Sequence, residues 1–296
     1  MSKIAWTGDT INCISGCTKV SPGCANCYAR EMTRRLKAMG KPKYAAGFDT
    51  VVCHEDVLRK FVAKPGKARR IFWNSMSDTF HSDVPFSFID QMFAAMALTK
   101  DQTHQILTKR AWRMREYFAD GAPVSSIGDA ASVILGEPAH MEPLPLPNVH
   151  LGVTVEDQER ADERIPDLLG TPAAVRFVSL EPLLGPVDLG IDCLAQEHDY
   201  DDSPVGYVPC DGCGGFMPLH QSHCTRLDWL VIGCESGPKR RECKLEWVED
   251  IVWQADDAGV PVFVKQLSID GQVSHDPSEW PAWARRQERP EQGDAR

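Results

Sequence analysis

The chain has 296 residues, of which 43% are hydrophobic and 25% are charged, and its formal net charge is −10. These proportions are typical of a folded globular protein and exclude an intrinsically disordered chain. Because lysine and arginine drive nonspecific binding to phosphates, the acidic balance also excludes a protein that wraps nucleic acid indiscriminately.

The N-terminal segment MSKIAWTGDT has no apolar signal-peptide core. No stretch of the sequence approaches the roughly 18 uninterrupted apolar residues that a membrane span requires. We therefore expect a cytoplasmic protein without a membrane partner. Clustered cysteines in such a compartment hold metal more often than they form disulfides, and this chain has eleven cysteines.

Short β-branched or aromatic runs alternate with helical stretches, which is the pattern of a parallel sheet with crossover helices. In chain order the pattern predicts strand 10–15, helix 25–39, strand 70–74, helix 87–99, strand 105–108, helix 111–119, strand 149–155, helix 158–169, strands 175–180 and 229–233, helix 245–258 and strand 260–265. We predict an α/β fold, a partial or complete (β/α) TIM-like barrel formed by 1–190 and 227–270. A doubly wound open sheet has the same strand pattern and remains the alternative.

Three segments interrupt this alternation. Residues 121–147 end in EPLPLP and are expected to form a connector without regular helix or central strand. Residues 191–226 carry their own cysteines and are expected to form a Cys/His-rich metal-binding insertion. Residues 271–296 form a C-terminal tail, which is mostly charged from Trp283 and is expected to fray.

The stretch GCTKVSPGCANCYA, residues 16–29, places Cys17, Cys24 and Cys27 in a C-x6-C-x2-C run. A structural zinc site normally has four protein ligands, so three thiolates leave one coordination position open. Iron–sulfur clusters are bound by cysteine thiolates, and a cluster held by three would keep one iron free. We favour that interpretation. A zinc site completed by His54 or His81 and a redox pair in CANC are the alternatives.

In a (β/α) barrel the reactive groups collect where the strands end, because the following loops form one mouth. Each predicted strand ends on polar or ionisable residues: Asp78, His81, Lys109, Arg110, Thr154, Glu156, Asp157, Ser179, Glu181, Glu235, Ser236, Lys265 and Gln266. Carboxylates and an ammonium group in one mouth would hold a zwitterionic ligand and position a substrate.

The three-cysteine loop after the first strand resembles the radical S-adenosylmethionine superfamily, whose commonest spacing is C-x3-C-x2-C. The motifs GCTKVSPGCANCYA, NVHLGVTVEDQERADERIPDLL, RFVSLEPLLGPVDL and WLVIGCESGPKRR…GVPVFVKQ resemble more closely a family of phage and prophage proteins of uncharacterised function. This second similarity extends from residue 4 to about residue 266.

The resemblance to radical enzymes implies that Cys17, Cys24 and Cys27 hold a 4Fe-4S cluster whose open iron chelates S-adenosylmethionine. A reductant such as flavodoxin or ferredoxin would then drive cleavage to methionine and a 5′-deoxyadenosyl radical. The residues assigned to cofactor binding are Tyr28, Asp78, Thr154, Glu156 and Ser179, and those assigned to catalysis are Glu181, Glu235 and Lys265.

A nucleobase or nucleotide is the expected substrate. Between residues 30 and 70, twelve lysines and arginines stand against four acidic residues. Such a segment is either a surface for a polyanion or a solvated helical face. In GPKRR, Lys239, Arg240 and Arg241 are either phosphate ligands or solvated loop charges.

A second metal motif, CDGCGGFMPLHQSHC, offers Cys210, Cys213, His220 and Cys224 in the spacing C-x2-C-x6-H-x3-C. Four such ligands suit a structural Zn²⁺ that stabilises a small insertion. An auxiliary cluster and unligated thiols are the alternatives.

Two functions of other classes remain open. One is a zinc-bearing nucleic-acid-binding protein without enzymatic activity, in which both cysteine groups are structural. The other is a metal-dependent hydrolase that uses the carboxylates of Asp78, Glu156, Glu181 and Glu235.

Overall fold

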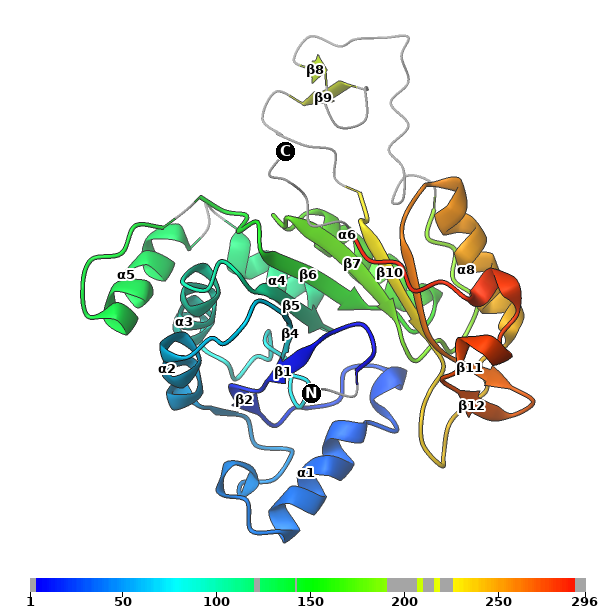
Figure 1. The fold of residues 1–296 in the computed structure, drawn as a ribbon, viewed down its shortest axis with the longest axis horizontal. Coiled ribbons are helices and arrows are strands. Elements are labelled where there is room, and N and C mark those ends of the chain that lie inside the picture. The colour runs from blue at the N-terminus through cyan, green and yellow to red at the C-terminus, as the bar shows by residue number, and fades with distance from the viewer. Residues whose placement is uncertain are drawn as a thin grey trace.

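The structure, a computed structural model, describes residues 4–119, 123–141, 143–190, 207–209, 216–218 and 226–290. Its centre is one eight-stranded sheet (Figure 1). In spatial order the strands are β1 (Asp9–Ile11), β4 (Arg70–Trp73), β5 (Thr103–Thr108), β6 (Val149–Thr154), β7 (Val175–Leu180), β10 (Trp229–Gly233), β11 (Val262–Ile269) and β12 (Gln272–Ser274).

The strands from β1 to β11 are parallel, and β12 pairs with β11 in the antiparallel sense. The predicted α/β class is therefore confirmed. The spatial order of the strands follows their order in the chain, whereas a doubly wound sheet reverses its order at a switch point. Within the described residues the sheet is open, with β1 and β12 at its two edges.

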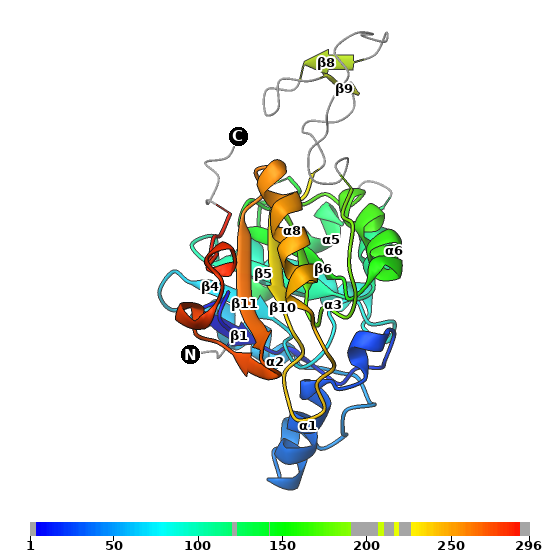
Figure 2. The same ribbon diagram turned by 90° about the vertical axis from the view of Figure 1, so that its right-hand side faces the viewer.

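The helices are α1 (Tyr28–Ala38), α2 (Glu55–Ala63), α3 (Phe86–Ala97), α4 (Ala111–Phe118), α5 (Val124–Leu135), α6 (Gln158–Leu169) and α8 (Leu245–Asp257). In the described residues, helices follow β1, β4, β5, β6 and β10 in the chain, and those other than α1 lie against one side of the sheet (Figure 2). Smaller elements are the strand pairs β2 (Ile14–Ser15) with β3 (Val52–Cys53) and β8 (Tyr207–Pro209) with β9 (Phe216–Pro218), and the 3-10 turns η1 (Pro22–Cys24), η2 (Pro42–Tyr44), η3 (Pro277–Glu279) and η4 (Ala282–Ala284). In the part of the chain described, none of the helices combines the length and apolar character needed to traverse a membrane.

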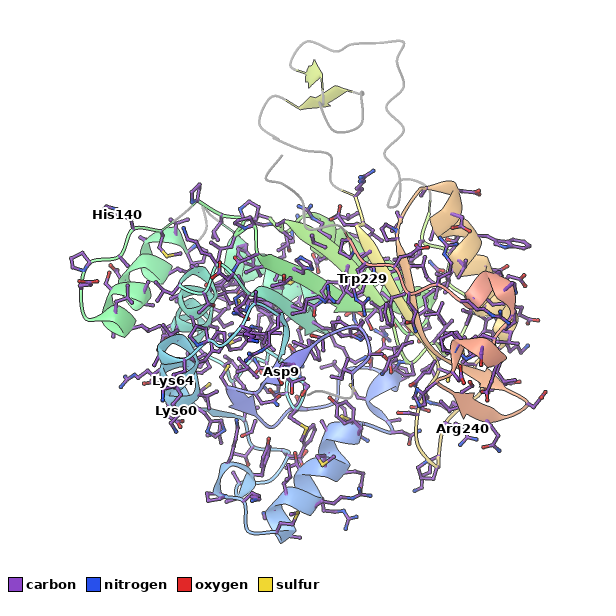
Figure 3. The ribbon with its side chains drawn as sticks, viewed as in Figure 1. Asp9, Lys60, Lys64, His140, Trp229 and Arg240 are labelled. Atoms are coloured by element: carbon purple, nitrogen blue, oxygen red, sulfur yellow. The ribbon has the colours of Figure 1, made fainter. Side chains whose placement is uncertain are left out.

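The two faces of the sheet bury different side chains because successive residues of a strand point in opposite directions. The inner face carries an aromatic cluster to which four different strands contribute, and Trp229 lies at its centre (Figure 3). Its buried members are Trp6, Phe72, Phe177, Trp229, Val231 and Phe263. Gly152 makes room for this cluster, since a Cβ there would lie 2.5 Å from the Phe177 ring. The amino-terminal half of the inner face is thus closed by packed rings.

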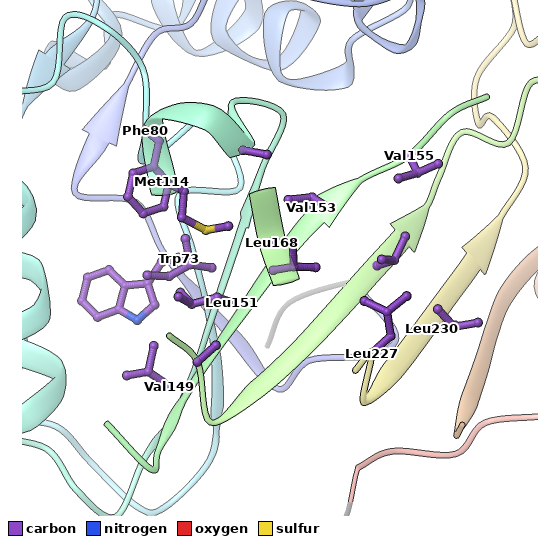
Figure 4. Close-up of a cluster of buried hydrophobic side chains, with 14 of the residues drawn as sticks. Trp73, Phe80, Met114, Val149, Leu151, Val153, Val155, Leu168, Leu227 and Leu230 are labelled. Atoms are coloured by element: carbon purple, nitrogen blue, oxygen red, sulfur yellow. The ribbon is translucent and has the colours of Figure 1, made fainter. Parts of the chain in front are cut away.

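The outer face forms the main core between the sheet and the helices (Figure 4). Leu151 and Val153 of β6 pack here with Leu168 of α6, and Leu230 of β10 lies in the same cluster. Two buried layers hold the strands rigidly, so the loops at the strand ends have a fixed base.

Residues 121–147 were expected to be a connector, and the structure corrects this prediction. Helix α5 begins after Pro123 and ends at Gly136, which has a positive φ of 79°. The prolines of the segment lie outside residues 124–135, and Ile127 and Ala131 are buried where α5 packs on α3. A high proline content therefore does not prevent a helix when the prolines are confined to its ends.

The charged tail also differs from expectation over its described part, residues 283–290. Val264 donates its backbone N–H to the carbonyl of Arg286 at 2.8 Å, and the Trp229 Nε1–H donates to the carbonyl of Glu288 at 2.9 Å. These bonds fix the segment along β11 and over the aromatic cluster. The charges do not make it fray because its backbone groups find partners in the sheet.

Candidate functional site

The three cysteines lie in the loop of residues 16–27, between β2 and α1, which we call the cysteine loop. It crosses the carboxyl ends of the parallel strands (Figure 1). The backbone N–H of Cys17 donates to the carbonyl of Phe48 at 2.8 Å, which fixes the start of the loop. Side chains that follow β4, β5, β6 and β10 hold the remainder.

The first anchor joins the ends of β4 and β5. Asp78 is buried, and its carboxylate accepts hydrogen bonds from Thr108 Oγ1 at 2.7 Å and from Arg110 Nη1 at 2.9 Å, besides two backbone amides. Arg110 in turn donates to the carbonyl and the hydroxyl of Thr18 at 3.1 and 2.9 Å, and its Nη1 lies 3.7 Å from Cys17 Sγ. Asp78 therefore orients an arginine that holds the cysteine loop.

The second anchor is Glu156, which follows β6 and is fully buried. Ser21 of the cysteine loop donates its hydroxyl to Glu156 Oε1 at 2.6 Å, and Lys109 Nζ binds the same oxygen. Arg164 Nη1 of α6 donates to Glu156 Oε2 at 2.9 Å and to the carbonyl of Thr154 at 2.6 Å. Burial alone would raise the pKa of Glu156, but Lys109 and Arg164 outweigh it and lower the pKa. The group is therefore a carboxylate with both oxygens engaged.

Gly23 is required by the same contact. A Cβ at residue 23 would lie 2.3 Å from Glu156 Oε1, closer than any side-chain carbon can approach. The turn of the cysteine loop thus rests directly on the buried carboxylate.

The third anchor follows β10. Arg241 donates its backbone N–H and Nε to Glu235 Oε2 at 2.8 and 3.0 Å and its Nη2 to Glu235 Oε1 at 2.6 Å. Asn26 Nδ2 of the cysteine loop also donates to Glu235 Oε2, at 3.1 Å, and Arg241 Nη1 donates to the carbonyl of Pro22 at 2.9 Å. Burial acts to raise the pKa of Glu235, but these donors lower it overall. Arg241 was considered a phosphate ligand, whereas here it pairs with Glu235.

Glu181 follows β7, and Lys265 lies within β11. Lys265 Nζ donates to Glu181 Oε1, and both side chains remain partly exposed. Thr154 of β6 and Ser179 of β7 are paired in register on neighbouring strands. Thr154 stands two residues before Glu156, and Ser179 stands two residues before Glu181. Tyr28 begins α1, and its hydroxyl donates to the carbonyl of Ser75 after β4. Of these five residues, Tyr28 is exposed and Glu181 and Lys265 are partly exposed, whereas Thr154 and Ser179 are buried.

The cysteines of the loop are free thiols at different depths. Cys24 is buried, whereas Cys17 and Cys27 are partly buried and pack on the same small cluster of Ala29, Phe48 and Met76. Burial raises the pKa of Cys17 to about 11, with further contributions from Asp78 and Cys24 that the nearby Arg110 opposes. A guanidinium beside the sulfur is the partner that a thiolate needs in a partly buried site.

The donor set therefore fits an iron–sulfur cluster in its chemistry, with three thiols in one anchored loop. Across the described residues, however, no three His, Cys, Asp or Glu side chains are already grouped so that they would coordinate a metal ion. Neither His54 nor His81 completes such a group: His54 Nε2 pairs with Ser15 Oγ at 2.9 Å, and His81 Nε2 pairs with Thr18 Oγ1 at 2.8 Å. The proposed second metal ligands Cys210, Cys213, His220 and Cys224 lie outside the described residues.

Sequence reasoning missed the residues that hold the loop. Arg164 sits within a helix of ordinary composition, and Ser21 and Asn26 are small polar residues between the cysteines. Asn74 was also missed. It adopts a positive φ of 58° after β4, and its side chain accepts from the Ile14 N–H at 3.1 Å. The only available signal was a run of small polar residues inside the three-cysteine motif.

The chain belongs to the DUF5131 family, described as "Protein of unknown function (DUF5131)", because the family model matches residues 1–289. No curated protein matches the chain. No solved structure matches it either.

Proposed function

We propose that this DUF5131 protein is a radical S-adenosylmethionine enzyme in which Cys17, Cys24 and Cys27 hold a 4Fe-4S cluster. The observation that carries the proposal is the cysteine loop itself. Three free thiols lie in a segment that is tied to the ends of four parallel strands. A sheet whose parallel strands follow chain order also suits a partial (β/α) barrel, in which such a mouth is the usual active site.

Once bound, such a cluster supplies an open iron for the amino and carboxylate groups of S-adenosylmethionine and an electron, delivered by flavodoxin or ferredoxin, that cleaves it. The chain itself prepares the loop. Arg110 lies beside Cys17 Sγ, where it opposes the rise of the Cys17 pKa that burial causes, and the Asp78 carboxylate keeps Arg110 in place. Ser21 and Asn26 hold the loop against Glu156 and Glu235.

The remaining groups of the mouth suit a small zwitterionic and nucleoside-like ligand. Lys265 would pair with a carboxylate, and Glu181 would accept hydrogen bonds from an ammonium or a hydroxyl group. The exposed ring of Tyr28 offers a surface for a base. The packed rings of the aromatic cluster exclude water from the other end of the inner face.

These contacts support the hydrolase alternative less well than the radical-enzyme proposal. It requires carboxylates that are able to bind a metal, but Asp78, Glu156 and Glu235 are each engaged by an arginine or a lysine. Glu181 pairs with Lys265, so all four carboxylates have a cationic partner. We therefore assign Asp78, Glu156 and Glu235 to positioning of the loop, in place of the ligand-binding and catalytic roles expected from the sequence.

The decisive experiment measures iron, sulfide and zinc in protein purified and reconstituted without oxygen. We expect about four iron and four sulfide per chain bound by the cysteine loop. Cys24→Ala should lose most of this iron, whereas Cys53→Ala, which changes a free cysteine outside the loop, should keep it. Protein that holds zinc and no iron would instead favour the nonenzymatic nucleic-acid-binding alternative and overturn the proposal.

A second assay tests the chemistry. The reconstituted protein, given S-adenosylmethionine and dithionite, should release 5′-deoxyadenosine and methionine in equal amounts. Cys24→Ala should release neither. An intact cluster without any cleavage of S-adenosylmethionine would leave an iron–sulfur protein but not a radical enzyme.

A further inference from the structure

Helix α1 follows the cysteine loop directly and stands away from the body of the molecule (Figures 1 and 2). Its buried residues are Ala29 and Thr33. Large apolar side chains occupy its exposed side: Tyr28 is 53%, Met32 41% and Met39 68% exposed. Spacings of four and seven residues place the three on one face of the helix. An apolar stripe of this kind on an exposed helix is suited to a ligand with flat faces.

The charged side chains in and just after this helix differ in whether they form ion pairs within the described chain. Arg30 pairs with Asp49 at 2.7 Å and Arg34 with Glu31 at 3.2 Å. Arg35, Lys37 and Lys41 are exposed and form no ion pair with any residue of the described chain. Arg35 lies on the same face as the apolar stripe, Lys41 follows the end of α1, and Lys37 lies on the opposite face, so Arg35 and Lys41 are the cations available to a polyanion there.

Positively charged side chains also lie on the other side of the cysteine loop. Lys239, in the loop between β10 and α8, is exposed, and its carbonyl accepts a hydrogen bond from Asn26 Nδ2 at 2.9 Å. Lys19 of the cysteine loop is also exposed, and Glu242 is the nearby exposed acid. In a chain of net charge −10, this rim is locally cationic.

We propose that α1 binds a single strand of nucleic acid, so that the substrate of the enzyme is a nucleotide within a strand. The inference rests on the proposed function and specifies its substrate class. Phosphates would pair with Arg35 and Lys41, and bases would lie on Tyr28 and Met32. Bases stack on exposed aromatic side chains with little dependence on sequence. An acidic protein is the other polyanion that these cations could bind, but its surface has no comparable flat group to place on Tyr28.

The position of Tyr28 explains why a single strand is preferred to a duplex. Tyr28 lies next to Cys27 and within reach of the strand ends, since its hydroxyl bonds to the Ser75 carbonyl. A base must leave its stack to enter a site enclosed by loops, and unpaired bases do so at the lowest cost. A helix of eleven residues is about 16 Å long, which suits a segment of about four nucleotides.

The test is fluorescence anisotropy of a labelled deoxythymidine 20-mer with the full chain, at several salt concentrations. The variant Arg35→Gln/Lys41→Gln should bind about tenfold more weakly, and the slope of log affinity against log salt should fall by about 1.4. The matched control is Lys64→Gln/Lys67→Gln, which removes two exposed lysines that follow α2; Lys64 is labelled in Figure 3. The control should bind as the wild type does.

Equal weakening by the two double variants would refute the inference, as would tighter binding of a duplex than of the single strand. Iron content separates this inference from the proposed function. Cys24→Ala should lose iron and keep its affinity for the 20-mer. Wild-type protein that holds the cluster but does not bind the 20-mer would preserve the proposed function and overturn the substrate assignment.

Discussion

Replacing Glu156 by glutamine removes one negative charge from the most enclosed ion-pair cluster of the site. The Glu156 side chain is 0% exposed and that of Arg164 is 1% exposed, whereas Lys109 is 20% exposed. Glutamine keeps the shape and an acceptor for the Ser21 hydroxyl, so the main loss is the partner of a buried guanidinium. The variant is therefore a direct test of the buried pair.

The magnitude follows from this difference in burial. Removing one partner of a buried pair costs about 3–5 kcal/mol, because the other charge stays in the interior uncompensated. Lys109 is able to turn toward solvent, so losing its pair with Glu156 costs about 1 kcal/mol or less. For a chain of this size, such a loss lowers the melting temperature by roughly 6–15 °C.

The same variant is also predicted to change how stability depends on pH. Burial opposes ionisation, but Lys109 and Arg164 hold the pKa of Glu156 below its ordinary value of 4.5. A lowered pKa contributes stability that is present above 4.5 and is lost as the pH falls through the pKa of the folded state. The difference in unfolding free energy between wild type and E156Q should therefore be constant well above pH 4.5 and shrink below it.

Urea unfolding followed by tryptophan fluorescence measures both the loss of unfolding free energy and its dependence on pH. The matched control is Glu163→Gln, also on α6, because Glu163 is 48% exposed and pairs closely with Arg160, at 2.7 Å, whereas its distance to Arg164 is 3.9 Å. It should change stability by about 0.5 kcal/mol or less. If E156Q and E163Q cost the same, or if the E156Q difference does not change in acid, the buried pair is not the anchor described above.

Two further predictions concern the loop and the mouth. Gly23→Ala should push the cysteine loop off Glu156, lowering stability by about 1–3 kcal/mol and reducing the iron bound on reconstitution. Gly185→Ala, where an added Cβ would meet nothing within 4 Å, should leave both properties unchanged, and equal results for the two variants would contradict the close contact. Lys265→Met should weaken binding of S-adenosylmethionine about tenfold or more in calorimetry while iron content stays the same. Glu181→Gln should keep the cluster and weaken binding less, so wild-type affinity in Lys265→Met would show that this pair does not contact the ligand.

The regular part of the fold was predictable because the local pattern determines it. Strands β7 and β10 and helix α6 have the bounds expected from sequence, since each is a periodic apolar segment between clear boundaries. Asp157 caps α6 by accepting from the Arg160 N–H at 3.0 Å. The first predicted strand divides into β1 and β2 because the side chain of Asn12 bonds to Ser75 and to the Met76 N–H, partners more than sixty residues away. Local periodicity does not show such contacts.

The candidate site was predictable in its place but not in its internal roles. The sequence placed the cysteine loop and the strand-end acids together, because parallel strands end at one edge. It did not show which acids would be neutralised. Glu156 and Glu235 are engaged by Arg164 and Arg241, which belong to the next helix and to a loop, and nothing in the residue types distinguishes them from Glu181. Roles of this kind depend on tertiary contacts.

Trp6 and the segment that includes Glu288 meet over the aromatic cluster, and Arg289 Nη2 donates to the carbonyl of Ala5 at 3.2 Å. Residues from near the two ends of the described chain are therefore neighbours, at the half of the sheet remote from the cysteine loop. A circularly permuted gene that joins these ends with a short linker should still fold, and an affinity tag at either end would leave the mouth unobstructed.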